Sequence, residues 1–264
     1  MNIFIHELKS NIKSLLIWSV IIGLLIVIAV AKFSGFADNP EMLSLFDSMP
    51  DAVIQVMQVE VFNLTTLTGF FGLMFLYFSL MGAMAAVLWG TGIISKEERD
   101  KTVEFSLVLP VSRNHVITFK ALAALIYCVA YVLITRGISL VLVRTYQPDP
   151  AFYKFLTLEM LAMFLIEIIF LSVGLLLGCS MKQYKLAGSA GVAFILGTYF
   201  LSILIDLTDK TRFLRVFSPF KYFNVGELYN TGRFEGIYLF LTAGIVIICL
   251  AVAYFMYNRR DLYI

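Results

Sequence analysis

Six long apolar stretches, nearly free of charged side chains, constrain what this 264-residue chain can fold into. A helix needs about 20 mostly apolar residues to cross a hydrocarbon layer about 30 Å thick. Hydrophobic residues make up 60% of the chain and charged residues 14%, whereas soluble domains have roughly 45–50% and 25%. We therefore predict an all-α integral membrane protein with one six-span transmembrane domain over residues 1–264. The predicted spans are residues 15–31, 61–95, 116–143, 152–181, 186–205 and 237–257.

The second stretch is too long for one upright crossing, because residues 61–95 would form a helix of about 52 Å. We expect Gly69 and Gly72 to mark a break or a shallow approach, with the crossing itself over residues 72–94. An even number of crossings places both termini on one side of the membrane. A modest excess of Lys and Arg on that side favours an N-in and C-in topology.

Three segments between or before the spans have their own signatures. Residues 6–13 alternate polar and apolar side chains at helical spacing, which predicts an amphipathic N-terminal helix at the inner interface. Residues 33–60 carry acidic but no basic side chains, which is typical of an outer loop. Residues 206–236 mix basic and aromatic side chains, which predicts short helices at headgroup level.

The sequence offers little support for catalysis or nucleic-acid binding. A net charge of +2 gives no basic excess for nucleic acid, and no phosphate-binding loop occurs. The two histidines lie far apart without a metal-ligand motif, and the three cysteines lie singly in apolar runs. We expect no catalytic, cofactor or metal site in this chain, so any ATP energy must come from a partner.

Three charged residues lie within predicted spans, where each must find water or a partner. Arg136 and Glu159 fall at similar depths on consecutive antiparallel helices and could form an ion pair. Glu167 lies deeper and has no evident partner. One interpretation is a structural ion pair plus a protonated or water-facing carboxyl group. The other is the polar lining of a translocation path.

A Gly-x-x-x-Gly motif, Gly174 to Gly178, lies in the fourth span. Such a motif lets two helix backbones approach closely. Packing within the chain and a seam between two copies of it are both open at this point.

The segment at residues 96–113 is the most informative. Its charged part ends the second span, an apolar run follows at residues 105–109, and Pro110 then enforces a turn. A compact amphipathic element of this kind can bind a protein partner through charge complementarity and an apolar ridge. A solvated loop is the alternative.

With this segment in place, the chain resembles the membrane subunit, or permease, of type-2 ABC exporters. That family's inner loop has a Glu, a Gly-Thr-Leu-Glu sequence, a short apolar run, Pro-Val-Ser-Arg and a later Lys. The corresponding residues here are Glu98, Lys101-Thr102-Val103-Glu104, residues 105–109, Pro110-Val111-Ser112-Arg113 and Lys120. Lys101 replaces the usual glycine. Two further matches flank the last span: Ser218-Pro219-Phe220-Lys221-Tyr222-Phe223 and Asn258-Arg259-Arg260-Asp261-Leu262.

The resemblance implies that the inner loop is a coupling helix that docks on a separate ATP-binding cassette subunit, which binds the ATP and magnesium. The implied docking residues are Lys96, Glu97, Glu98, Arg99, Asp100, Lys101, Thr102, Glu104, Pro110 and Arg113. Residues 206–236 would form outer re-entrant helices. A second permease subunit, identical or homologous, would complete the translocation path.

The same resemblance implies an ATP-driven exporter in a bacterial cell membrane, embedded in the lipid bilayer, that carries an amphiphilic, peptide-like, antibiotic or lipid substrate. The alternative is a secondary transporter or channel that is driven by an ion gradient, with Arg136, Glu159 and Glu167 as gating residues. Transport without any nucleotide would distinguish it.

Overall fold

The computed structural model describes residues 3–37, 39, 63–99, 112–181, 183–207 and 209–259. Within them, six helices are long and apolar enough to cross a membrane, as the sequence predicts. Three short 3-10 helices and one short α-helix complete the described elements. The long helices are α1 (Ile3–Phe33), α4 (Leu67–Arg99), α6 (Arg113–Val143), α7 (Pro150–Ser180), α8 (Tyr184–Asp206) and α10 (Gly236–Arg259).

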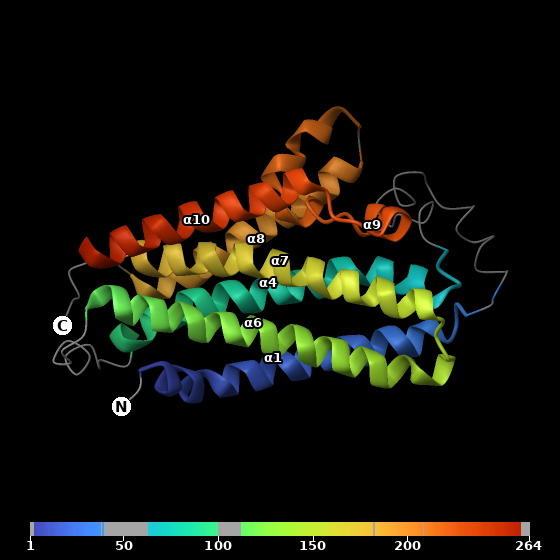
Figure 1. Cartoon of the computed structure of the whole chain (residues 1–264), viewed down its shortest axis with the longest axis horizontal. Coiled ribbons are helices and arrows are strands. Elements are labelled where there is room, and N and C mark those ends of the chain that lie inside the picture. Colours follow the sequence, from blue (N-terminus) through green and yellow to red (C-terminus); the bar gives the residue numbers. More distant parts are fainter. Residues whose placement is uncertain are drawn as a thin grey trace.

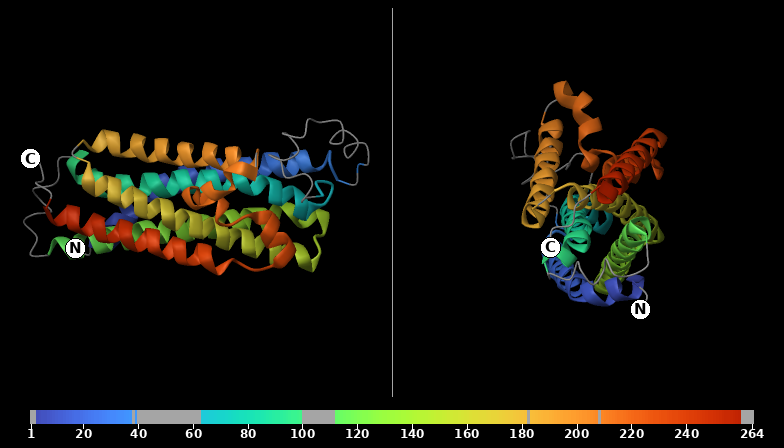
Figure 2. Two further views of the ribbon diagram at one scale, coloured as in Figure 1. Left: turned by 90° about the horizontal axis from the view of Figure 1, so that it is seen from above. Right: turned by 90° about the vertical axis from the view of Figure 1, so that its left-hand side faces the viewer.

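The long helices form one elongated bundle (Figure 1). In its centre α7 packs most extensively against α4 and also contacts α6, α8 and α10. On one side α1 lies against α6 and α4, and α8 covers α4 on another side, as the end view of Figure 2 shows. The first turn of α1 and the last turn of α10 lie at the same end of the bundle (Figure 1).

Glycines make the close packing of α4 on α7 possible. A Cβ atom at Gly174 would lie 2.5 Å from the Val87 carbonyl oxygen, and one at Gly90 would lie 2.7 Å from the Leu171 carbonyl oxygen. Gly178 faces the same helix, because a Cβ atom there would lie 3.1 Å from Ile94 Cβ. The Gly-x-x-x-Gly motif therefore packs within the chain.

Residues 67–95 of the second apolar stretch lie in one unbroken helix, so the predicted break at Gly69 and Gly72 is wrong, while the alternative of a shallow approach stays a prediction. The 33 residues of α4 extend over about 50 Å. Gly69 instead permits a tight approach to the helix, since a Cβ atom there would lie 2.2 Å from the Asn63 carbonyl oxygen. A helix of this length must tilt or extend beyond the hydrocarbon layer.

The amphipathic segment at residues 6–13 is helical, and it continues directly into the first span within α1. Its polar face is not wholly in solvent, because Glu7 is buried. This part of α1 is therefore integrated into the bundle through its contacts with α6 and α4.

Short helical segments connect the two shortest spans. They are η2 (Asp209–Phe217), η3 (Pro219–Lys221) and α9 (Val225–Thr231), and the first of them projects beside the bundle (Figure 1). The prediction of short helical pieces between α8 and α10 is confirmed. Their depth in the membrane stays a prediction. A further 3-10 turn, η1 (Arg144–Tyr146), connects α6 to α7.

Candidate functional site

The predicted docking segment emerges between the end of α4 and the start of α6. Most of its residues lie outside the part of the chain whose side chains the structure describes: Glu97, Glu98, Arg99, Asp100, Lys101, Thr102, Glu104 and Pro110. The backbone of α4 continues through Arg99, and α6 begins at Arg113. Of the predicted docking side chains, only Lys96 and Arg113 are described, and both bond within the bundle.

Arg113 joins the start of α6 to the end of α10. Its Nη1 donates to the carbonyl oxygens of Tyr257, at 3.4 Å, and Asn258, at 3.2 Å. The Asn258 amide in turn donates to the Asn114 side-chain oxygen at 2.7 Å. Ser112 caps α6 by accepting from the backbone N–H of His115. Arg113, from the motif that ends the docking segment, therefore contacts Asn258, from the motif that follows the last span.

Lys96 and Trp89 join the end of α4 to α1. The Lys96 ammonium donates to the Ser10 carbonyl oxygen at 3.1 Å. The Trp89 indole N–H donates to the Ser14 hydroxyl at 3.0 Å. The helix that leads into the docking segment is therefore fixed to the first turns of the chain.

A buried ion pair joins three helices just below the docking segment. Lys120 Nζ lies 3.1 Å from Glu7 Oε1 and donates to the Ile93 carbonyl oxygen at 2.8 Å. Tyr127 adds a hydrogen bond from its hydroxyl to the Leu8 carbonyl oxygen. A buried pair needs such good geometry, because taking two charges out of water costs several kcal/mol per ion. We call Glu7, Lys120, Tyr127, Lys96 and Trp89 the α1 clamp.

Sequence reasoning placed Lys120 near a span end but did not identify its partner. The signal was available, because a lysine inside an apolar stretch needs a buried acceptor or a counter-ion. Glu7 falls in the segment whose periodicity predicts an amphipathic helix at the inner interface, and periodicity alone does not give the residue that pairs with it.

The predicted pair between Arg136 and Glu159 is wrong. The Arg136 guanidinium donates instead to the Thr157 hydroxyl at 3.1 Å, on the partly exposed surface of the bundle. Glu159 is fully buried, and neither of its carboxyl oxygens has a hydrogen-bond partner among the described residues. Arg136 on α6 thus bonds to a partly exposed residue of α7, whereas Glu159 faces the buried interior of the bundle.

Glu167 occupies a narrow space between α4, α6 and α7. Its Oε1 lies where a Cβ atom at Gly82 would be only 2.6 Å away. The Cys128 thiol and the Tyr131 hydroxyl are near, yet no described group makes a well-formed hydrogen bond to its carboxyl oxygens. Within the described residues, the Cys128 thiol is thus a neighbour of this carboxyl group that the sequence did not identify.

The family motif Ser218–Phe223 forms the buried core of the segment between α8 and α10. All six of its residues, from Ser218 to Phe223, are buried. Lys221 forms an ion pair with Asp206 at the end of α8, and Phe220 packs on Phe170 with ring centroids 5.3 Å apart. Burial lowers the pKa of Lys221, although the Asp206 carboxylate opposes this shift. The motif thus anchors this segment to α7 and α8.

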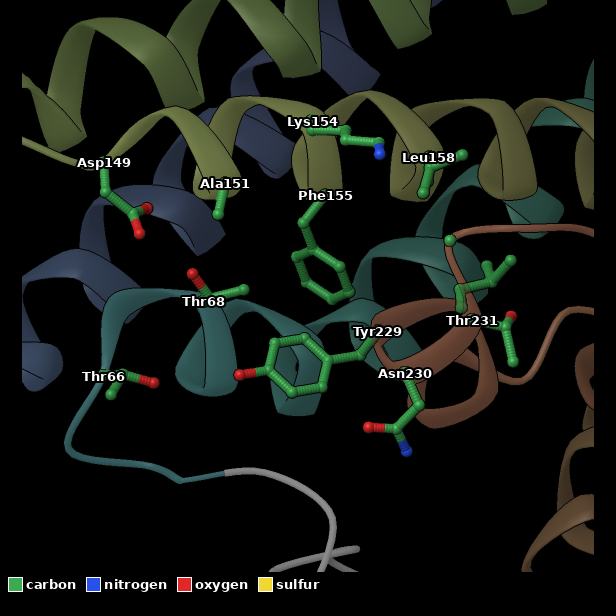
Figure 3. A pocket seen from close by; sticks show the side chains of 12 residues that line it. Thr66, Thr68, Asp149, Ala151, Lys154, Phe155, Leu158, Tyr229, Asn230 and Thr231 are labelled. Atoms are coloured by element: carbon green, nitrogen blue, oxygen red, sulfur yellow. The ribbon is translucent and has the colours of Figure 1, made fainter.

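A polar cavity of about 390 Å³ opens at the end of the bundle opposite the α1 clamp, between the start of α4, the start of α7 and α9. Figure 3 shows Asp149, just before α7, near Thr68 at the start of α4, with the rings of Phe155 and Tyr229 to one side of them. The two aromatic rings meet edge to face, with centroids 5.6 Å apart. The cavity combines hydroxyl, carboxyl and aromatic groups with the ammonium group of Lys154.

No group of three or more His, Cys, Asp or Glu side chains with metal-binding geometry occurs among the described residues. The three cysteines are free and buried.

Comparisons with known proteins bear on the whole chain. A family model described as "ABC-2 family transporter protein" matches residues 1–262. The comparison with curated proteins gives no match.

Proposed function

Because the chain belongs to the ABC-2 family of transporter membrane proteins, we propose that it is the permease subunit of an ATP-driven exporter. It is a multi-pass membrane protein of an ABC transporter, a class in which a separate ATP-binding subunit supplies the energy. In our proposal, two permease subunits enclose the path and two ATP-binding subunits drive it. The complex lies in a bacterial cell membrane, and ATP and magnesium bind only to the partner subunits.

The observation that carries the proposal is the α1 clamp and its position. It fixes α1 to α4 and α6, the two helices between which residues 100–111 emerge. On the other side, Arg113 fixes α6 to α10. A force applied to the docking segment would therefore move four helices together, which is what a coupling element requires.

This proposal assigns each part of the chain a task without covalent chemistry. Residues 96–113 receive the movement of the ATP-binding subunit on the cytosolic face, and the helices transmit it across the membrane. The polar cavity of Figure 3 then lies on the outer side, where cargo leaves. An amphiphilic cargo, such as a peptide, an antibiotic or a lipid, suits a chain whose interior is aromatic and weakly polar.

Charge reversal in the docking segment tests the proposal. A variant with Glu97→Lys, Glu98→Lys, Arg99→Glu and Lys101→Glu should still insert into the membrane but lose co-purification with the ATP-binding subunit. Reversing Lys154, which is exposed and distant in sequence from this segment, is the matched control. Unchanged co-purification of the quadruple variant would exclude these residues from docking.

A secondary transporter or channel is the second candidate, and the buried carboxyl groups of Glu159 and Glu167 favour it. It predicts uptake or release of cargo by proteoliposomes that contain this chain alone under an ion gradient. Our proposal predicts transport only with the ATP-binding subunit and ATP present.

A further inference from the structure

A second pocket, of about 260 Å³, lies between α1 and α4 near the start of the chain. Trp89 forms part of its wall, and Gly92 forms another part. A Cβ atom at Gly92 would meet no described atom within 4 Å, so this wall faces open space. We call this space the Trp89 pocket.

The charged side chains among the described residues that line the Trp89 pocket are those of two lysines, Lys13 and Lys96. The nearest acidic group on α1, Glu7, is paired with Lys120 at 3.1 Å. Ser14 accepts from the Trp89 N–H, so its own hydroxyl hydrogen is available for a ligand. Two ammonium groups and a hydroxyl donor suit a phosphate group with several acceptor oxygens.

The pocket lies at the boundary between apolar and polar residues on both helices. Lys13 comes two residues before the uncharged stretch at residues 15–31, and Lys96 directly follows the stretch at residues 61–95. Lipid phosphates lie at this depth, and tryptophan is enriched there. On the next turns of α1, Leu16, Ile17 and Val20 are about 60% exposed and can contact an acyl chain.

We propose that the Trp89 pocket binds the phosphate headgroup of an anionic lipid from the leaflet at the chain's N-terminal end. Basic pockets between transmembrane helices recognise anionic headgroups in this way. The lipid would lie against the α1 clamp, since Trp89 and Lys96 belong to both. This site does not depend on the proposed function. If that function is correct, the leaflet at the N-terminal end is the cytoplasmic one.

Lipid binding to the purified full-length complex tests this proposal without ATP turnover. Native mass spectrometry would compare phosphatidylglycerol with phosphatidylcholine of identical acyl chains. We expect retention of phosphatidylglycerol to be at least about fivefold higher, and Lys13→Gln to reduce it about fivefold, the effect of one basic residue near the membrane surface. Gly92→Leu should fill the pocket and remove the preference. Lys32→Gln, an exposed lysine at the other end of α1, should have no effect.

Three outcomes would overturn the proposal. Equal retention of both lipids would remove headgroup recognition, and unchanged preference in both Lys13→Gln and Gly92→Leu would place the lipid elsewhere. Displacement of phosphatidylglycerol by millimolar inorganic phosphate, with phosphate retained on the protein, would identify a soluble phosphate ligand instead. Because Lys13 is exposed, its variant keeps the test valid even if Gly92→Leu fails to fold.

Discussion

A buried glutamate lies in the α1 clamp and another lies in the middle of the bundle, and the two differ in whether a counter-ion is close to the carboxyl group. Glu7 is only 3% exposed, and it lies 3.1 Å from a lysine that also bonds to α4. Glu167 is fully buried, yet no described residue forms a well-shaped hydrogen bond with its carboxyl oxygens. One carboxyl group joins helices to each other, and the other fills a space next to Gly82.

This difference indicates where the bundle must stay rigid. A buried ion pair is sensitive to geometry, because its attraction outweighs the cost of desolvation only at short distance. Such a pair joins α1 to the two helices on either side of the docking segment, where the proposed function requires movement to be transmitted. In the middle of the bundle, packing of glycines and apolar side chains holds α4 to α7 instead.

Removing one partner of the clamp should have the largest effect. Lys120→Met leaves the Glu7 carboxylate buried without its counter-ion, and we expect a loss of about 3–5 kcal/mol in stability. The measurement is the thermal unfolding midpoint of the purified protein in detergent. Lys154→Met, at an exposed lysine, should stay within about 0.5 kcal/mol of the wild type.

The double variant Glu7→Gln with Lys120→Met sharpens this result. It removes both charges, so most of the lost stability should return, as it does when a buried pair is replaced as a unit. A double variant that is as unstable as Lys120→Met alone would show that packing, not charge, accounts for the loss.

Filling the space beside Glu167 should have the next largest effect. A Cβ atom in Gly82→Ala would lie 2.6 Å from Glu167 Oε1 and 3.0 Å from Met163 Cε, so we expect a loss of about 1–3 kcal/mol. Gly137→Ala, in open space on α6, should be neutral or slightly stabilising. Adding Glu167→Ala should restore part of the stability, and its failure to do so would mean that another contact opposes the methyl group.

The number and type of the spans were predictable because hydrophobic length alone sets them. The structural role of Gly69 was not predictable in the same way. Glycine is compatible with a helix break and also with a close backbone approach, and only the position of Asn63 distinguishes the two. The same ambiguity applied to Gly174, whose neighbouring backbone comes from α4 in this chain.

The charged residues show why the candidate site was only partly predictable. Depth along a helix is readable from sequence, which is how Arg136 and Glu159 were matched. The face of the helix that each occupies depends on how several helices pack, and packing gave Arg136 a bond to Thr157 instead. The partner of Lys120 was 113 positions away along the chain, beyond the reach of any local pattern.

Exchanging the unpartnered carboxyl group should have a small effect. Glu167→Gln keeps the shape of the side chain, and its amide can still accept from the nearby Cys128 thiol, so we expect a change below about 1 kcal/mol. ATP-dependent transport should also be unchanged. A stable Glu167→Gln protein that no longer transports would instead place this group in the path of the cargo or of a coupled ion.

The smallest effect on stability is expected at Lys221. This buried residue differs from both Glu7 and Glu167, because it has a counter-ion and yet a lowered pKa. It has a counter-ion in Asp206, yet burial lowers its pKa below the usual 10.5. The folded protein therefore releases the Lys221 proton at a lower pH than the unfolded chain does. Between the lowered pKa and 10.5 the unfolded chain binds more protons, so the contribution of Lys221 to the free energy of unfolding rises with pH in this range. Thermal unfolding of the wild type and of Lys221→Met between pH 7 and 10.5 measures this contribution as a difference. We expect the difference to shift in favour of the wild type towards the alkaline end, and a shift in favour of Lys221→Met would show that Asp206, not burial, dominates at this lysine.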